Sequence, residues 1–295
     1  MNNFKPSKGL SRYMFGRITG RRNPNGIDYG FLLTAGLALL VVITLWWTPL
    51  LFPFRIFTTT VHEASHAVIG MVTGGKLRPD GAIELRWNGA GVTYFYNVGF
   101  DILTYAAGYV GSTLFGGFLL LMAKRASTRR QVLYYITAGL ILLTVFFIRD
   151  VQSIIMVGLV AVLTGFVAYK APDLVVTFYV FVTAILNVAY ALFDLLGLIF
   201  ASASPFEIFD LNGKGGNDAS FLAARTGIPA IVWALIWSAL SVFMLWRFVR
   251  IAIRVGYNQE RAPRKSLFGG FGGKRDNSAN GKAQSSFEKY DKLFK

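Results

Sequence analysis

The sequence predicts an all-α polytopic membrane protein with about six to seven transmembrane or re-entrant helices and a small β-hairpin insertion. Of the 295 residues, 54% are hydrophobic and only 15% are charged, whereas a soluble domain carries about 25% charged residues. The mean hydropathy is +0.49. Long apolar stretches recur along the chain, and basic residues flank them. This composition excludes an ordinary soluble enzyme and a disordered chain.

Six segments are apolar over enough residues to cross a bilayer as a helix, which takes roughly 20 residues. The first is too long for the core of a signal peptide and has no A-x-A cleavage site, so we expect a retained anchor. The helix predicted over Ile56–Val72 is less apolar and stops at Gly74-Gly75, so it could span the membrane or only dip into it. The six spans are predicted at about 29–52, 103–123, 132–148, 154–169, 174–200 and 228–249.

A β-hairpin is predicted over residues 81–97, between two of the helices. Apolar and polar residues alternate from Ile83 to Trp87, and Asn88-Gly89 is a strong turn signal. The residues from Val92 to Tyr96 are β-branched or aromatic, as in strands.

The net charge of +15 is concentrated at the two ends of the chain. Basic residues next to apolar spans mark the cytoplasmic side of a membrane protein. We therefore expect a basic cytoplasmic arm over 1–28, a membrane-embedded domain over 29–255 and a basic disordered tail over 256–295. The 124–130 loop and Lys170 are also expected in the cytoplasm. Six spans and a non-spanning Ile56–Val72 helix satisfy all these placements. We therefore expect a multi-pass protein of the cytoplasmic membrane, with both termini in the cytoplasm. Membrane lipid is an expected partner and nucleic acid is not.

Residues His62 to His66 form an H-E-x-x-H motif and contain both histidines of the chain. Two histidines at i and i+4 on a helix share a face and can bind one metal ion, with Glu63 as the base for a metal-bound water. The alternative is an ordinary polar helix face. An apolar neighbourhood favours the metal site, because ionisable groups are costly there and usually functional.

The third metal ligand has to be a carboxylate or an amide, because the chain has no cysteine and no further histidine. Asp194 lies inside a long apolar run, where an unpaired charge costs about 2.5–3.5 kcal/mol and a metal would remove that cost. Pairing with Asn187, two helical turns away, is the alternative. Asp218 is the rival ligand, although an acid just before a helix also suits a cap. Asn187 and Asn217 are candidates for site support.

These features together resemble the site-2 protease family of intramembrane zinc metalloproteases, more specifically its bacterial peptidase-like branch. The resemblance rests on residues 62–75, 91–93, 107–117 and 217–237, in this order. It implies that His62 and His66 are zinc ligands and that Glu63 is the catalytic glutamate. The family usually takes its third ligand from N-x-x-P-x-x-x-L-D-G. Asn187 and Asp194 lie in a related segment that lacks the proline and the D-G pair. Asn217-Asp218 is similar to an element of this branch. Either Asp194 or Asp218 can therefore be the third ligand.

The resemblance implies zinc-dependent hydrolysis of peptide bonds within or near the membrane, with zinc-bound water activated by Glu63, as in regulated intramembrane proteolysis. The substrate would be a transmembrane protein or peptide. The predicted hairpin could hold an unwound substrate by strand pairing, or could be a plain structural loop. The alternatives are a non-proteolytic scaffold or chaperone that retains a zinc site, and a cation-coupled transporter. The intact Glu63 favours the protease, and the lack of internal repeats disfavours the transporter.

Overall fold

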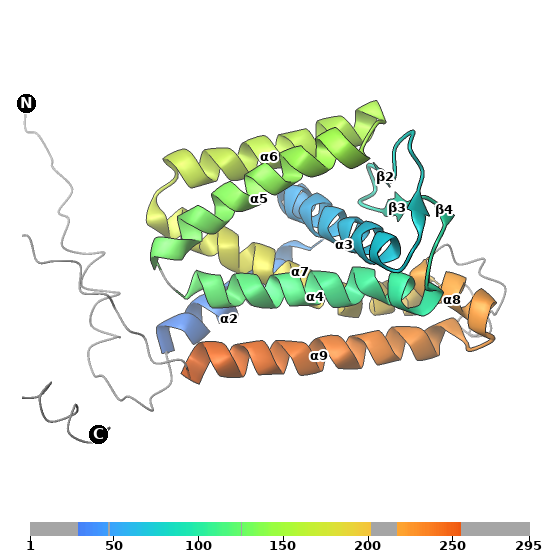
Figure 1. Ribbon diagram of the computed structural model, residues 1–295. Coiled ribbons are helices and arrows are strands. Elements are labelled where there is room, and N and C mark those ends of the chain that lie inside the picture. Colours follow the sequence, from blue (N-terminus) through green and yellow to red (C-terminus); the bar gives the residue numbers. More distant parts are fainter. Residues whose placement is uncertain (1–28, 47, 125, 202–216, 255–295) are drawn as a thin grey trace, which may run out of the picture. The chain divides into compact units, whose positions relative to one another are not determined.

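The computed structural model describes residues 29–46, 48–124, 126–201 and 217–254, and the predicted fold class is confirmed (Figure 1). Five helices of this part, namely α4, α5, α6, α7 and α9, are long and apolar enough to cross a membrane, and α2 is a shorter apolar helix. The predicted arm over 1–28 and tail over 256–295 lie outside the described residues. The helices are α2 (Tyr29–Leu45), η1 (Pro49–Leu51, a 3-10 turn), α3 (Phe52–Val72), α4 (Asp101–Ala123), α5 (Ala126–Phe147), α6 (Val151–Lys170), α7 (Asp173–Ala201), α8 (Asp218–Thr226) and α9 (Ala230–Arg254).

The first apolar stretch does not form one helix over 29–52, so the predicted end of this span is wrong. Helix α2 ends at Leu45, and Thr48 is extended with φ −90° and ψ 155°. Pro49 accounts for the break, because a proline disfavours the helical conformation of the residue before it. Helix α3 then begins at Phe52, four residues before the predicted start, with Pro53 in its first turn, where a proline is tolerated.

The predicted hairpin is confirmed. Strand β2 (Ile83–Leu85) pairs antiparallel with β3 (Gly91–Thr93), and Gly89 in the turn has a φ of +90° that favours glycine. A second pair joins β1 (Lys76–Leu77) to β4 (Phe95–Asn97). The hairpin is docked between helices: the Thr59 hydroxyl of α3 donates to the carbonyl of Gly89, and the amide of Leu85 donates to the hydroxyl of Ser153 in α6.

Helix α4 lies at the centre of the bundle and packs against α3, α7 and α9 (Figure 1). Glycines permit this close packing. A Cβ atom at Gly116 would lie 2.6 Å from the Ala184 carbonyl oxygen of α7, and one at Gly117 would lie 2.1 Å from the Phe248 ring of α9. Small residues at such contacts let the backbones of membrane helices approach closely. The position of α4 relative to α7 is therefore fixed by backbone contact.

Basic side chains bind helix ends on one side of the bundle. The Lys124 ammonium group donates to the carbonyl of Ala252 in α9. The Arg130 guanidinium group donates to the carbonyls of Ala168 and Ala171 at the end of α6, and forms an ion pair with Asp173. Cations are favourable at such positions because the last carbonyls of a helix carry partial negative charge. We call this side, where α4, α6 and α9 end, the basic end.

We predict that Gly116→Ala lowers the free energy of unfolding by about 1–3 kcal/mol, since the added methyl group would overlap the α7 backbone. Thermal unfolding in detergent would measure the change. Gly139→Ala is the matched control, because nothing lies within 4 Å of a Cβ atom at Gly139. Equal midpoints for the two variants would show that α4 and α7 can separate without loss.

Candidate metal centre

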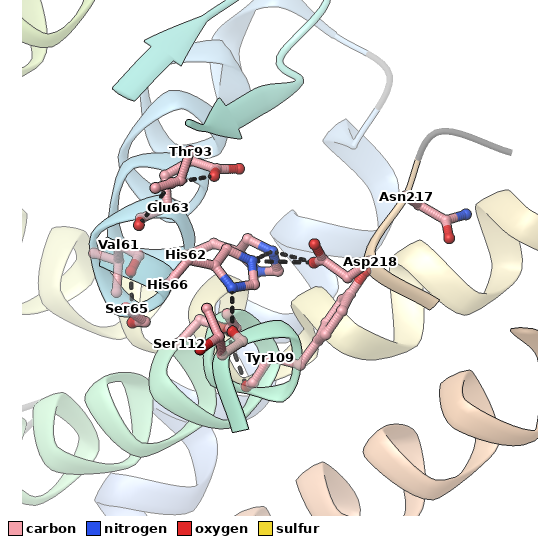
Figure 2. Close-up of polar contacts among 12 residues, drawn as sticks. Val61, His62, Glu63, Ser65, His66, Thr93, Tyr109, Ser112, Asn217 and Asp218 are labelled. Carbon is pink, nitrogen blue, oxygen red and sulfur yellow. Dashed lines mark hydrogen bonds and ion pairs between the residues drawn. The ribbon is translucent and has the colours of Figure 1, made fainter. Parts of the chain in front are cut away.

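Helix α3 places the two histidines on one face, as their spacing predicts. Both are buried, with 4% of each residue exposed, and their Nε2 atoms lie 3.0 Å apart. Figure 2 shows the two rings side by side, pointing away from α3 toward α8. The pair therefore presents two nitrogen atoms to one point inside the protein.

Asp218 of α8 reaches this same point. Its Oδ2 atom lies 2.9 Å from Nε2 of His62 and 3.1 Å from Nε2 of His66. Each of the three residues offers one ligand atom within 4.8 Å of the others. Asp218 does not cap its helix: the cap is Asn217, whose side chain accepts from the amide of Ser220 and points away from the histidines (Figure 2).

The surroundings of Asp218 keep its carboxylate charged. Burial would raise the pKa of Asp218, but the charge of His66 and the hydrogen bonds from both histidines hold this pKa well below its ordinary range. The amino terminus of α8 adds a favourable partial positive charge. Helix α8 is itself held against α4 by the Arg225–Asp101 ion pair, at 2.6 Å, and by the stacked rings of Tyr105 and Phe221.

The hydrogen bond of His66 to the α4 backbone decides which ring nitrogen is free. Its Nδ1 atom lies 2.6 Å from the carbonyl oxygen of Thr104. Because a carbonyl oxygen only accepts, Nδ1 carries a proton, so Nε2 is the nitrogen that can offer its lone pair when a metal ion binds. This is the usual arrangement of a histidine that binds a metal. The ring of His62 is held instead by edge contacts with Tyr109 and Tyr190, at 4.7 and 4.9 Å between ring centroids.

Gly108 of α4 leaves open the space next to the histidines. A Cβ atom at this position would lie 2.4 Å from Nε2 of His62 and 2.5 Å from Nε2 of His66. No other amino acid would fit without moving the two rings. The absence of a side chain at position 108 thus preserves room at the point where the nitrogen atoms meet.

The hairpin fixes Glu63, which is 5% exposed. The Thr93 hydroxyl of β3 lies 2.7 Å from Oε2 of Glu63 and 2.9 Å from its carbonyl oxygen, and donates to them. Strand β3 also packs tightly here, since a Cβ atom at Gly91 would lie 2.7 Å from Oε1 of Glu63. The strand therefore sets the position of a buried carboxylate next to the histidines (Figure 2).

The three ligand atoms fit a zinc ion. Nitrogen and oxygen ligands of zinc lie about 2.0–2.2 Å from the metal, so in a tetrahedral set they are about 3.3–3.6 Å apart. The distances of 2.9, 3.0 and 3.1 Å among the three atoms are some tenths of an ångström shorter, so a small outward shift of the side chains would admit the ion. Two histidines and one carboxylate are also a known ligand set of catalytic zinc, which keeps a fourth position for water.

The remaining candidate residues, Asn187 and Asp194, belong to α7. Asn187 of α7 is fully buried and donates to the Thr183 carbonyl and the Thr58 hydroxyl, so it joins α7 to α3 one turn before His62. Asp194 belongs to α7, but its side chain lies outside the described residues. The sequence analysis includes Gly108 only within the range 107–117 and singles out neither tyrosine, because no local pattern indicates which residues face the histidines.

Comparison with protein-family models matches residues 35–248 to the family described as Peptidase M50B-like. The comparisons with curated proteins and with solved structures found no match. The matched segment covers more than half of the chain and contains His62, Glu63, His66 and Asp218.

We predict that Gly108→Ala lowers zinc affinity about 10–100-fold, as expected when the surroundings of a metal ligand are disturbed. The added methyl group would displace both histidine rings. Zinc titration of the purified protein would measure the change. Gly158→Ala should bind zinc as the wild type does, because nothing lies within 4 Å of a Cβ atom there. Unchanged affinity in Gly108→Ala would contradict a metal position between the two histidines.

Proposed function

The chain belongs to the Peptidase M50B-like family, and from that premise we propose that it is an intramembrane zinc metalloprotease that hydrolyses peptide bonds within or near the membrane. The resemblance to the site-2 protease family is thereby confirmed. The chain is an integral membrane protein by its apolar helices and its family. The observation that carries the proposal is the convergence of His62, His66 and Asp218 on one point beside Glu63.

We propose His62, His66 and Asp218 as the zinc ligands. Sequence reasoning favoured Asp194 and kept Asp218 as the rival. The contacts of Asp218 with both Nε2 atoms support the rival. Histidines that bind a metal ion do so as neutral imidazoles, so a carboxylate as third ligand would supply the negative charge that they lack.

Glu63 is proposed as the general base and acid. When bound, zinc polarises the scissile carbonyl and lowers the pKa of a water ligand to about 7. Glu63 takes the proton of the attacking water and delivers it to the leaving amine. The hydrogen bond from Thr93 to Oε2 leaves Oε1 for this proton transfer and keeps the carboxylate from turning away. A scaffold that merely retained a metal would not need Glu63 held in this manner.

The open edge of β3 supports binding of an extended substrate. The amide of Tyr94 donates to the carbonyl of Ala82 on the β2 side, and because backbone groups alternate along a strand, those of Gly91 and Thr93 point to the other edge. Among the described residues, no hydrogen bond reaches the backbone of either residue. A substrate strand added there would pass next to Glu63, which Thr93 contacts.

We predict that purified wild-type protein binds one zinc ion per chain and that Asp218→Ala and His62→Ala lose it. Asp194→Ala should retain zinc, because the three proposed ligands stay intact. Elemental analysis of detergent-purified protein would give the zinc content. Loss of zinc in Asp194→Ala with retention in Asp218→Ala would return the third ligand to Asp194. Wild-type protein without zinc would refute the metal site.

We further predict that Glu63→Gln keeps the zinc but abolishes proteolysis, since an amide cannot accept the proton of water. The measurement compares membrane proteomes of cells that express the wild type or Glu63→Gln. Asp80→Asn is the matched control, because this exposed acid lies in the turn between β1 and β2 and is none of the proposed site residues. Cleavage products that are the same with wild type and Glu63→Gln would refute the protease.

A further inference from the structure

An open groove runs along α9, where this helix packs against α7. Its volume is about 580 Å³, and its lining contains Leu192 of α7 and residues of α9 from Leu235 to Trp246. Apart from Ser238, which is buried, the lining side chains are apolar or aromatic. Both helices contain a segment that is long and apolar enough to cross a membrane, and α9 lies at the edge of the bundle (Figure 1). The groove therefore opens toward lipid hydrocarbon rather than water.

The line of the groove leads to two arginines near the basic end. Residues three or four positions apart share one face of a helix, so Val242, Trp246 and Arg250 follow one another along α9. Arg247 comes one turn after Phe243, at the flank of the same line. The guanidinium carbon of Arg250 lies 4.9 Å from the centroid of the Trp246 ring. This cation–π contact holds a positive charge at the end of an apolar groove.

Neither arginine is neutralised by an acidic side chain in the part of the chain that the structure describes. The five ion pairs found there include neither Arg247 nor Arg250, and α9 contains no acidic residue. Both arginines are exposed. The apolar segment of α9 ends at Ile253, and with a rise of 1.5 Å per residue the two arginines lie about 5 and 9 Å before this end. Arginines at this depth extend their charged groups to the level of the lipid head groups.

The size of the groove and the charge at its end indicate what kind of molecule fits. A helix is 10–12 Å wide, so over the length from Leu235 to Trp246, about 16 Å, it would occupy roughly 1,300–1,900 Å³. This is more than twice the volume of the groove, whereas a single hydrocarbon chain is much thinner than a helix. A guanidinium group binds a phosphate group with two parallel hydrogen bonds. A hydrocarbon chain joined to a negatively charged phosphate matches both features.

We propose that this groove holds one acyl chain of an anionic phospholipid, whose phosphate group pairs with Arg247 and Arg250. The chain fills the apolar part of the site and the phosphate neutralises the two arginines, so a lipid rather than a free anion is the ligand. Basic sites between membrane helices are known to bind such head groups. The proposal does not depend on the proposed function, because no proposed zinc ligand lines the groove, and neither does Glu63.

The other end of the groove lies near the metal centre. Leu235 and Ser238, which line the groove, flank Trp237 along α9. The Trp237 ring stacks on Tyr109, with 4.7 Å between the centroids, and Tyr109 contacts His62 by its ring edge. The acyl chain therefore lies along the turn of α9 that supports Tyr109. A ligand that binds only the folded protein also stabilises it, so the lipid holds α9 in place against α7.

Lipid titration of the full-length protein tests the proposal. The protein is purified in detergent, freed of lipid by detergent exchange, and titrated with phosphatidylglycerol or with phosphatidylcholine that has the same acyl chains. Native mass spectrometry counts the bound lipids and gives the dissociation constant of the first. Glycerol 3-phosphate is added in separate titrations as a phosphate head group without an acyl chain.

The double variant Arg247→Gln/Arg250→Gln tests the charge. The wild type should bind the first phosphatidylglycerol about 10–30-fold more tightly than phosphatidylcholine, since each basic residue near a membrane surface contributes about fivefold. The double variant should lose this preference. Arg86→Gln/Arg149→Gln is the matched control, because these two exposed arginines lie in the hairpin and in the α5–α6 connection, and it should bind as the wild type does. Equal affinity of the wild type for both lipids, or an unchanged preference in Arg247→Gln/Arg250→Gln, would overturn the phosphate site.

Ala239→Phe tests the groove, because this exposed residue belongs to its lining. The added ring should lower the affinity for phosphatidylglycerol about 10-fold, since it displaces several methylene groups from the groove. Ile236→Phe is the matched control, at an exposed position of α9 outside the lining. Unchanged affinity in Ala239→Phe, or displacement of the lipid by an equal concentration of glycerol 3-phosphate, would overturn the acyl-chain site. A dimer that Ala239→Phe abolishes, without any lipid-bound monomer of the wild type, would assign the groove to a second copy of the chain and overturn the lipid site.

Discussion

The contact of Asp218 with His62 and His66 is the interaction on which the other features of the site depend. Three polar atoms meet in a buried position, with distances of 2.9 to 3.1 Å. Removal of one partner from a buried charged group costs about 3–5 kcal/mol, because the others stay without compensation. The protein therefore has to hold all three in place at once. The Thr104 carbonyl orients one imidazole, two tyrosines hold the other, and α8 supplies the carboxylate.

The two carboxylates near this point are held in different ways, which suits different roles. Asp218 contacts both imidazoles and sits at the amino terminus of a helix, where negative charge is favourable. Glu63 is fixed from the opposite side by Thr93 and by the close approach of Gly91. The hairpin thus belongs to the candidate site. The hydrogen bond from Thr59 of α3 holds the hairpin against this helix and so helps to fix the position of β3 next to Glu63.

Local sequence patterns predicted those features that depend only on residues close together in the chain. The spacing of His62 and His66 fixes a shared helix face, and Asn88-Gly89 fixes a turn. The end of the first helix was missed because hydropathy stays high across Pro49, whose effect is on backbone geometry. The choice between Asp194 and Asp218 is of another kind. Hydropathy ranks acidic residues by the cost of their burial. The contacts of Asp218, however, depend on how α8 packs against α3, since Asp218 is 152 positions from His66 and 156 from His62.

This separation along the chain also determines the order in which the residues of the candidate site are synthesised. Helix α3, which contains both histidines, is synthesised early, and three long apolar helices follow before α7 is complete. The carboxylate that meets the histidines arrives only with α8, just before α9. A ribosome-bound or truncated chain that stops before residue 218 holds both imidazoles and Glu63 but not this carboxylate. With Asp218 as the proposed third ligand, the metal centre cannot assemble until synthesis has passed residue 218 and α8 has packed beside the histidines.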